Sequence, residues 1–332
     1  MIFHPSIVAL YVASILIGFM VLYSASYGVQ ILRKWDIRSG SEGQLILERK
    51  TYLISTLLTY VFGFELLSLF LYIFTVDRLH TFFVGAMCAA GTLYVNSYGY
   101  PALILKSVNF LLAGLWLILN YADNRGYDYP LIKKKYFFLL ILTPLILAEM
   151  ILQASYFLRL NPHIITSCCG SLFSLGERSF TSEMVALPTT PTKIVFCLAM
   201  TLTLASGFSF YRKGKGAYLF SSLSAITFIV SLASILSFIS VYFYELPTHH
   251  CPFCILQKEY GYIGYPLYMA LFGGTISGMG VGVLMPFRKM ESLSEVLPSI
   301  QKRLAIASLV LFSLFTAIVT YRMVVSGLML EG

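Results

Sequence analysis

The stretch that decides the fold class is AYLFSSLSAITFIVSLASILSFISVYFYE, residues 217–245. It carries no charged residue before Glu245, and it is longer than the ~20 residues that an α-helix needs to cross the hydrocarbon core of a bilayer. Seven more apolar segments recur along the chain, at about residues 5–31, 51–76, 101–122, 136–158, 193–211, 265–286 and 304–328. The sequence therefore predicts an all-α membrane protein with eight transmembrane helices.

The composition excludes a soluble globular protein. Of the 332 residues, 58% are hydrophobic and only 11% are charged, whereas a soluble chain carries roughly 25% charged residues. The mean hydropathy is +0.80. Lys and Arg outnumber Asp and Glu by 23 to 15, and in a chain this apolar the excess indicates membrane topology. We expect contact with the lipid bilayer and no nucleic-acid partner.

The basic residues predict the orientation. They follow the first, third, fifth and seventh apolar segments, as Arg33, Lys34, Arg38, Arg49 and Lys50, then Arg125 and Lys133 to Lys135, then Arg212, Lys213 and Lys215, and finally Arg288, Lys289, Lys302 and Arg303. Loops rich in Lys and Arg stay in the cytoplasm. We therefore expect a multi-pass protein of the inner (cytoplasmic) membrane, with both termini on the outer, periplasmic side.

Two outer segments end in similar turns and indicate an internal repeat. YGYP at 98–101 precedes the third apolar segment, and YGYIGYP at 260–266 precedes the seventh; Cys88 and Cys254 lie at nearly the same distance before the two prolines. The stretch 81–99 is apolar, but if it crossed the membrane the Lys-rich loop 133–135 would lie outside. We therefore expect an outer-face half-helix there. Enrichment of Tyr at membrane interfaces is the alternative explanation of the shared turns.

The repeat predicts two four-helix halves of the same orientation, as in parallel repeats. The first half is expected at 1–158, with an outer half-helix at 80–99. An outer linker loop at 159–192 carries Cys168 and Cys169. The second half is expected at 193–332, and its outer half-helix carries the Cys251-x-x-Cys254 motif.

The sharpest chemical signal is this Cys-x-x-Cys motif, on the side where disulfides are permitted. With Pro252 at the first helical position, Cys251 becomes the cap of a helix whose dipole stabilises a thiolate. Cys254 follows one turn later, so a disulfide between the two is easily formed. Lys258 lies a further turn along the same face, where its charge lowers the thiol pKa or holds an anionic or quinoid electron acceptor.

In Cys251, Cys254, Gln257 and Lys258 the motif resembles the signature of the DsbB family, four-helix membrane proteins that couple thiol–disulfide exchange to a quinone. The vitamin K epoxide reductases have similar architecture and chemistry. The resemblance implies a redox-active Cys pair and a quinone held near the last two residues. Lys258 stands where the family usually has Arg, and the two cations bind differently. The resemblance covers one short motif, and eight spans exceed the length of a simple member.

The DsbB family also has a second redox Cys pair in a later outer loop. Here Cys168 and Cys169 are the candidates, although they precede the motif and are adjacent. A disulfide between neighbouring residues is strained and easily reduced, because their Cα atoms lie only about 3.8 Å apart. Either one of them exchanges with Cys251, or they form a structural disulfide that tethers the linker loop to the second half.

Two glutamates fall inside spans, Glu65 and Glu149. Carboxylates within a membrane indicate a proton path or a buried ion pair, for which Lys106, Gln153 and Lys258 are the candidate partners. A protonated Glu bonded to a neighbouring helix is the third possibility. Because a quinone-linked reaction must move protons, we assign Glu149 to the predicted cofactor site.

A second interpretation is a metal or haem site on the outer face. His249, His250, Cys251 and Cys254 are its predicted ligands, and they suit zinc or copper. A b-type haem held by His is also possible, whereas Ile255 after the motif argues against covalent c-type attachment. The protein would then be a membrane subunit of an electron-transfer complex. The repeat and the buried acids leave a transporter as a third hypothesis.

The favoured hypothesis is an integral membrane thiol–disulfide oxidoreductase. Cys251 and Cys254 would cycle between dithiol and disulfide, and Cys168 and Cys169 would pass electrons from an outer-side redox protein or another subunit. A membrane quinone would accept the electrons. Its expected contacts are Gln257, Lys258, Glu149 and His250.

Overall fold

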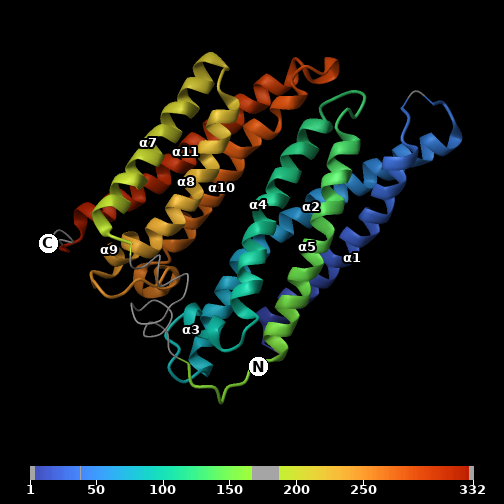
Figure 1. The fold of residues 1–332 in the computed structure, drawn as a ribbon. Helices are drawn as coiled ribbons and strands as arrows, with labels where there is room; N and C mark the ends of the chain where they lie inside the picture. The colour runs from blue at the N-terminus through green and yellow to red at the C-terminus, as the bar shows by residue number, and fades with distance from the viewer. Residues whose placement is uncertain (1–3, 38, 167–186, 329–332) are drawn as a thin grey trace. The chain divides into compact units, whose positions relative to one another are not determined.

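The computed structural model describes residues 4–37, 39–166 and 187–328. Within these ranges the chain is helical and contains no strand (Figure 1). The long helices are α1 (Pro5–Lys34), α2 (Glu42–Arg78), α4 (Gly99–Asp123), α5 (Ile132–Leu158), α7 (Thr189–Lys213), α8 (Ala217–Ser234), α10 (Gly264–Val283) and α11 (Val296–Val325). The prediction of an all-α protein is confirmed.

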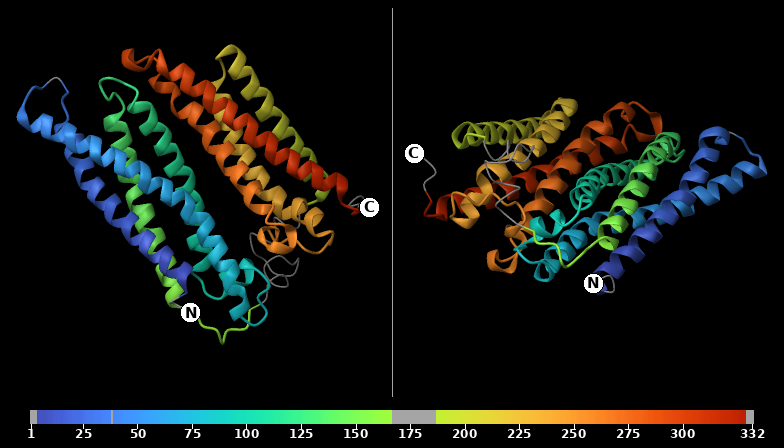
Figure 2. Two further views of the ribbon diagram at one scale, coloured as in Figure 1. Left: turned by 180° about the vertical axis from the view of Figure 1, so that it is seen from behind. Right: turned by 60° about the horizontal axis from the view of Figure 1, so that its bottom comes forward.

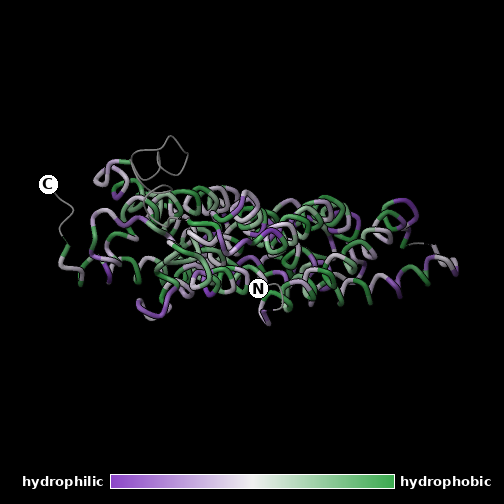
Figure 3. Tube along the Cα trace, turned by 90° about the horizontal axis from the view of Figure 1, so that it is seen from below, coloured by the Kyte–Doolittle hydropathy of each residue, from purple (hydrophilic) through white to green (hydrophobic). Residues whose placement is uncertain are grey.

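Among the described residues, eight helical segments are long and apolar enough to cross a membrane, which confirms the eight predicted spans. In the sixth of them, α8 continues through a π-helical turn, Ile235–Ile239, into the short helix α9, Ser240–Tyr244. Figure 3 shows hydrophobic residues along most of the helical trace. Large apolar side chains such as Phe19, Phe64 and Ile229 are more than 60% exposed, as is expected of side chains that face lipid.

The chain divides into two compact units. Unit 1 comprises Met1–Thr75, Asn96–Leu160 and Pro286–Ile300; unit 2 comprises Val76–Val95, Asn161–Met285 and Gln301–Gly332. The units differ from the two expected halves mainly in two short exchanges: residues 76–95 group with unit 2, and residues 286–300 group with unit 1. The internal repeat itself stays a prediction.

The two outer half-helices are shorter than expected. In place of a half-helix over 80–99, a 3₁₀ turn (Leu79–Phe82) is followed, after a break, by helix α3 (Ala89–Tyr94). The Cys-x-x-Cys segment forms two single 3₁₀ turns, Cys254–Leu256 and Lys258–Tyr260. The expected helix over this motif is therefore wrong. Extended backbone at Gln257 (ψ 162°) separates the two turns and prevents a continuous helix.

In unit 1, α5 packs against both α1 and α4, and side chains of α2 join the same hydrophobic core; Figure 2 shows these four helices from two further directions. The rings of Phe62 on α2 and Trp116 on α4 meet edge to face, with centroids 4.8 Å apart. The indole N–H of Trp116 donates to the carbonyl of Lys135, at 3.1 Å. Such contacts fix the register of the helices that carry the buried charges described below.

In unit 2, α8 packs between α7 and α10. Gly278 and Gly282 of α10 face Ser224 and Ser221 of α8, so closely that an added Cβ would collide with the serine side chains. Small residues at this spacing let two membrane helices approach closely. This packing places the end of α9 and the start of α10 together, and the Cys-x-x-Cys segment connects them.

Candidate functional site

Two loop segments of unit 2 build the candidate site: residues 79–95 after α2, and residues 245–263 between α9 and α10. Gln257 joins them, because its Nε2 donates to Asp77 Oδ1 at 3.1 Å and to the carbonyl of Met87 at 2.9 Å. The same Asp77 oxygen accepts the backbone N–H of Ala89 at 3.1 Å. One carboxylate thus fixes the start of α3 relative to the Cys-x-x-Cys segment.

Three thiols meet where these segments touch. The sulfur atoms of Cys88, Cys251 and Cys254 all lie within 4.8 Å of one another. Cys88 Sγ and Cys251 Sγ are 3.5 Å apart, although the two residues are 163 positions apart in the sequence. All three side chains are buried, with exposures of 0%, 0% and 5%. The cluster can form a disulfide in more than one pairing, or it can ligate a metal ion.

Tyr244 supports the backbone of the motif. Its hydroxyl donates to the carbonyl of Cys251 at 2.5 Å and accepts the N–H of Ile255 at 2.9 Å. Tyr268 donates to the carbonyl of Pro252 at 2.7 Å. Buried backbone groups need such partners, so the two tyrosines hold a segment that lacks the hydrogen bonds of a regular helix.

Gly85 permits a close approach beside Cys88. Its φ is +87°, a backbone conformation that glycine adopts at little cost. A Cβ on Gly85 would collide with the carbonyl oxygen of Thr166. Thr166 in turn donates its N–H to the carbonyl of Val84 and its hydroxyl to the carbonyl of Gly91, both at 3.0 Å. These bonds fix the loop on both sides of Cys88.

The two histidines have different surroundings. His249 Nε2 lies 3.4 Å from Cys254 Sγ, and its ring packs against the ring of Tyr244 with centroids 4.4 Å apart. His250 Nδ1 donates to the carbonyl of Leu236 in the π-helical turn, at 3.0 Å. His249 therefore contacts the thiol cluster directly, whereas His250 connects the motif to the π-helical turn after α8.

Burial governs the ionisation of this site. It raises the pKa of the Cys251 thiol well above its ordinary value, and contact with Cys254 adds to the rise. It lowers the pKa of the His249 imidazole. The expectation of a thiolate stabilised by a helix dipole is wrong, because no helix begins at Pro252 and a single 3₁₀ turn carries no comparable dipole. Burial therefore favours the neutral thiol form of Cys251.

The remaining predicted residues lie in different places. Lys258 is exposed, and the break at Gln257 removes the helical register that was expected to align it with Cys254. Glu149 belongs to unit 1, where it pairs with Lys106, one of its predicted partners. Cys168 and Cys169 lie outside the described residues, so their predicted exchange with Cys251 stays a prediction.

Sequence reasoning missed three residues of the site. Cys88 is marked in the sequence only by the apparent repeat, because a Cys in an apolar stretch is commonly a small apolar filler. Asp77 and Tyr244 carry no local signal, because an acid at a helix end and a Tyr at a membrane interface are both common. Their roles depend on contacts between distant segments.

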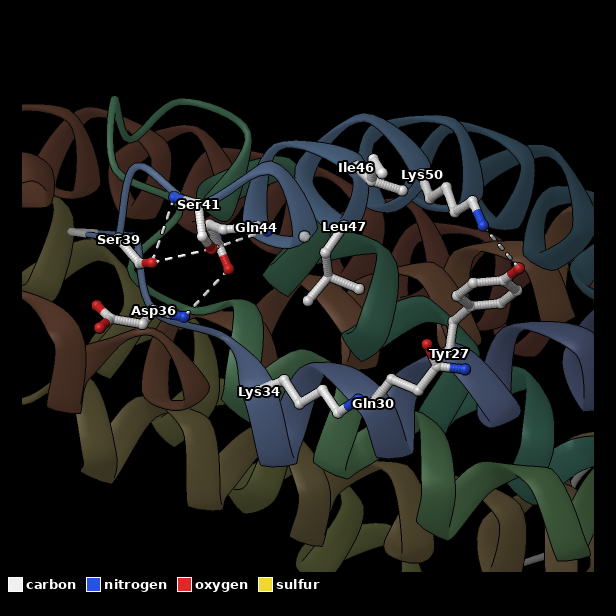
Figure 4. Close-up of a pocket in the computed structure, with 11 residues that line it drawn as sticks. Tyr27, Gln30, Lys34, Asp36, Ser39, Ser41, Gln44, Ile46, Leu47 and Lys50 are labelled. Atoms are coloured by element: carbon white, nitrogen blue, oxygen red, sulfur yellow. Dashed lines mark hydrogen bonds between the residues drawn. The ribbon is translucent and has the colours of Figure 1, made fainter.

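The described residues also line cavities outside the thiol cluster. One of about 340 Å³ in unit 1 lies between α1 and the start of α2 (Figure 4). It is lined by polar residues that include Lys34, Asp36 and Gln44. Another of about 680 Å³ in unit 2 is lined by Phe243, Tyr260 and residues of α11. The second cavity adjoins the candidate site, because Tyr260 packs against Tyr244 with ring centroids 4.9 Å apart.

Comparisons of this chain with protein-family models, with curated proteins and with solved structures found no match.

Proposed function

We propose that the protein is a membrane thiol–disulfide oxidoreductase whose reacting groups are Cys88, Cys251 and Cys254. The observation that carries this proposal is the gathering of three buried sulfur atoms within 4.8 Å. A disulfide bond is about 2.05 Å long, so Cys88 and Cys251 would need to approach by about 1.5 Å, and any other pair by less than about 3 Å. Cys251 is central, because it belongs to the Cys-x-x-Cys motif and also lies 3.5 Å from Cys88.

The proposed reaction balances in two halves. In the first, a dithiol on an outer-side partner loses two electrons and two protons and becomes a disulfide, while a disulfide of the cluster is reduced to two thiols. In the second, the cluster dithiol passes two electrons and two protons to a membrane quinone. The dithiol becomes a disulfide again, and the quinone becomes a quinol. Cys168 and Cys169 are proposed to carry electrons from the partner to Cys251. The likeness of the motif to the DsbB family agrees with this scheme.

We propose that the quinone binds in the cavity of about 680 Å³. Phe243 and Tyr260 offer aromatic faces, and Arg322 of α11 lines the same cavity. The guanidinium donates to the carbonyl of Phe243 at 3.0 Å, while its Nε is buried without a hydrogen-bond partner among the described residues. We propose Arg322 as a cation for the quinone, in addition to the predicted contacts Gln257 and Lys258.

We place this site at the outer face of the inner (cytoplasmic) membrane, with both termini on the outer side. The direction of the helices in unit 2 supports this placement. α7 ends at Lys213, and the turn to α8 carries Lys215. The Cys-x-x-Cys segment follows α9, at the opposite end of α8. If the basic turn is cytoplasmic, the thiols lie outside.

The test is an activity assay on the purified protein in detergent, with dithiothreitol as the dithiol and a short-tailed quinone as the acceptor. We expect one quinol formed per dithiol oxidised. Cys251→Ser should abolish turnover, and Cys197→Ser is the matched control because Cys197 is exposed on α7. Equal turnover in the wild type and in Cys251→Ser would refute the proposal.

A metal site is the second candidate, because the three sulfur atoms and His249 together make a plausible tetrahedral set for zinc or copper(I). His250 fits this set less well than expected, since its Nδ1 is bonded to Leu236. The protein would then be a metal-binding subunit of an electron-transfer complex. Metal analysis of protein isolated without chelator distinguishes the two: one metal per chain, lost in Cys254→Ser and retained in Cys197→Ser, would favour this candidate.

A further inference from the structure

Unit 1 buries a second group of reactive side chains, inside its helices. Glu65 lies on α2, Lys106 on α4 and Glu149 on α5, with exposures of 3%, 1% and 3%. All three lie within segments that are apolar enough to cross a membrane. Ionisable groups at such depth are costly to bury, and they commonly mark sites of function.

The contacts make one connected cluster. Lys106 Nζ lies 2.6 Å from Glu149 Oε1 and donates to Ser68 Oγ at 2.8 Å. Asn109 Nδ2 donates to the other carboxylate oxygen of Glu149, at 2.6 Å. The carboxyl of Glu65 is buried one turn before Ser68 on α2, near enough to Lys106 and Glu149 to interact with both. Two carboxyl groups can form a hydrogen bond with each other only when one of them carries a proton.

The charge count favours a proton on one of the two acids. Two carboxyl groups and one ammonium leave a net charge of −1 if both acids are ionised, and an uncompensated buried charge costs several kcal/mol. The helices packed around the cluster add no compensating cation. α1 carries charge only at its far end, at Arg33 and Lys34. The remaining ionisable groups nearby are Tyr72 and Tyr156; the Tyr72 ring centroid is 5.9 Å from Lys106 Nζ.

The other charges on these helices do not change the count. Lys135 on α5 is paired with Asp123 on α4 at 2.6 Å, so this second pair is neutral by itself. The rest lie in the first three turns or the last turn of α2, or in the first turn of α5, namely Glu42, Glu48, Arg49, Lys50, Asp77, Arg78, Lys133 and Lys134.

The cluster is also short of hydrogen-bond donors. Asn109 Oδ1 and Gln153 Oε1 are buried and accept no hydrogen bond among the described residues. Asn109 touches Glu149 directly, and Gln153 lies one turn beyond Glu149 on α5. With an unused acceptor on Asn109 beside Glu149, a protonated carboxyl would add a donor to a cluster that has few.

We propose that Glu65 and Glu149 share one proton beside Lys106, and that this cluster is a reversible proton-binding site within the membrane-spanning part of unit 1. In the protonated state of the site, Glu65 is neutral and Lys106–Glu149 is an ion pair. In the deprotonated state, both acids are ionised. This proposal does not depend on the thiol chemistry of unit 2.

Infrared spectroscopy of the purified protein tests the proton count. A protonated carboxylic acid has a carbonyl band distinct from that of a carboxylate, and the band shifts in D₂O if the proton exchanges. We expect a band equivalent to one buried acid per chain at neutral pH. It should disappear in Glu65→Gln. It should also disappear in Glu149→Gln, because Lys106 then pairs with an ionised Glu65.

Lys106→Met is expected to change the intensity of the protonated-acid band in the opposite direction. Without the ammonium, both acids should be protonated, so the band should double. Glu259→Gln is the control, since this exposed acid lies in unit 2 and its loss should leave the band unchanged. If Lys106→Met fails to fold, the two Gln variants still show whether the cluster holds a protonated carboxyl. A band that Glu65→Gln leaves intact, or no band in the wild type, would overturn the proposal.

Discussion

The two units bury different chemistry inside similar sets of helices. In the described part of the chain, the five fully buried charged side chains all belong to unit 1: Glu65, Lys106, Asp123, Lys135 and Glu149. The buried polar groups of unit 2 are uncharged, mostly hydroxyls such as the Thr203–Thr227 pair at 2.7 Å. Unit 2 instead concentrates its reactive groups, three thiols, in the loops at one end of its helices.

This difference agrees with the distinct tasks proposed for the two units. Paired charges inside a bundle hold helices in register and can store a proton, but they are intolerant of losing one partner. The hydroxyls of unit 2 bond to backbone carbonyls of their own or a neighbouring helix, or to one another, and they carry no charge that needs a partner. We therefore expect large stability effects from single substitutions in unit 1 and mainly local effects around the thiols in unit 2.

The largest expected effect comes from Asp123→Ala. Lys135 would remain buried without its partner, which should lower the free energy of unfolding by about 3–5 kcal/mol. Removing both charges, in Asp123→Leu with Lys135→Met, should restore much of that loss. Denaturant unfolding of the two variants in detergent measures the difference. Equal stability of the single and double variants would contradict the contrast between the units.

Gly85→Ala tests the loop beside Cys88. The substitution forces a positive φ on alanine and pushes Cβ against the carbonyl of Thr166. We expect a loss of about 1–3 kcal/mol, concentrated in this loop. Local hydrogen exchange of residues 83–92 measures it. Gly216→Ala is an informative control, because Gly216 also has a positive φ but its Cβ would meet no neighbour. A similar loss in both variants would show that the Thr166 contact contributes nothing.

Tyr244→Phe tests the support of the thiol motif. The N–H of Ile255 and the carbonyl of Cys251 lose their common partner, and each unsatisfied buried group costs about 1–3 kcal/mol. Some of this is regained when the loop relaxes, so we expect a net loss of about 1–2 kcal/mol. Thermal unfolding measures the stability, and the rate of thiol exchange at Cys251 should change with it. An unchanged exchange rate would show that Tyr244 does not influence the reactivity of Cys251.

The smallest effect concerns the ionisation of Cys251. Burial raises its pKa, so the folded thiol stays protonated across a pH range in which the unfolded chain already forms thiolate. Each unit by which the pKa rises lowers the thiolate fraction about tenfold. Alkylation of Cys251 by iodoacetamide should therefore be slower in the folded protein than in the unfolded chain at pH 8. Faster alkylation in the folded state would contradict the assignment.

The parts of the structure that depend on local pattern were predictable. The spans follow from uninterrupted apolar length, and the Lys106–Glu149 pair follows from two opposite charges at similar depth in neighbouring spans. The helix over the Cys-x-x-Cys motif was wrong, because Pro252 is compatible with a helix start and with a tight turn, and packing against Tyr244 and Tyr268 selects the turn.

The sequence alone could not predict which cysteines form the thiol cluster. The contact between Cys88 and Cys251 joins loops from the two expected halves, and neither loop reveals its partner. A buried Cys has the same local pattern as an apolar filler. The roles of Gln257 and Asp77 were similarly hidden, since their hydrogen bond spans 180 positions. The predicted roles of Cys168 and Cys169 still await a test.

Disulfide mapping by mass spectrometry tests the central claim most directly. The protein is oxidised with a short-tailed quinone, its remaining thiols are alkylated under denaturing conditions, and its peptides are analysed. We predict both a Cys88–Cys251 and a Cys251–Cys254 disulfide, with the first retained in Cys254→Ser and the second retained in Cys88→Ser. Recovery of Cys88, Cys251 and Cys254 as fully alkylated thiols after oxidation would contradict the account.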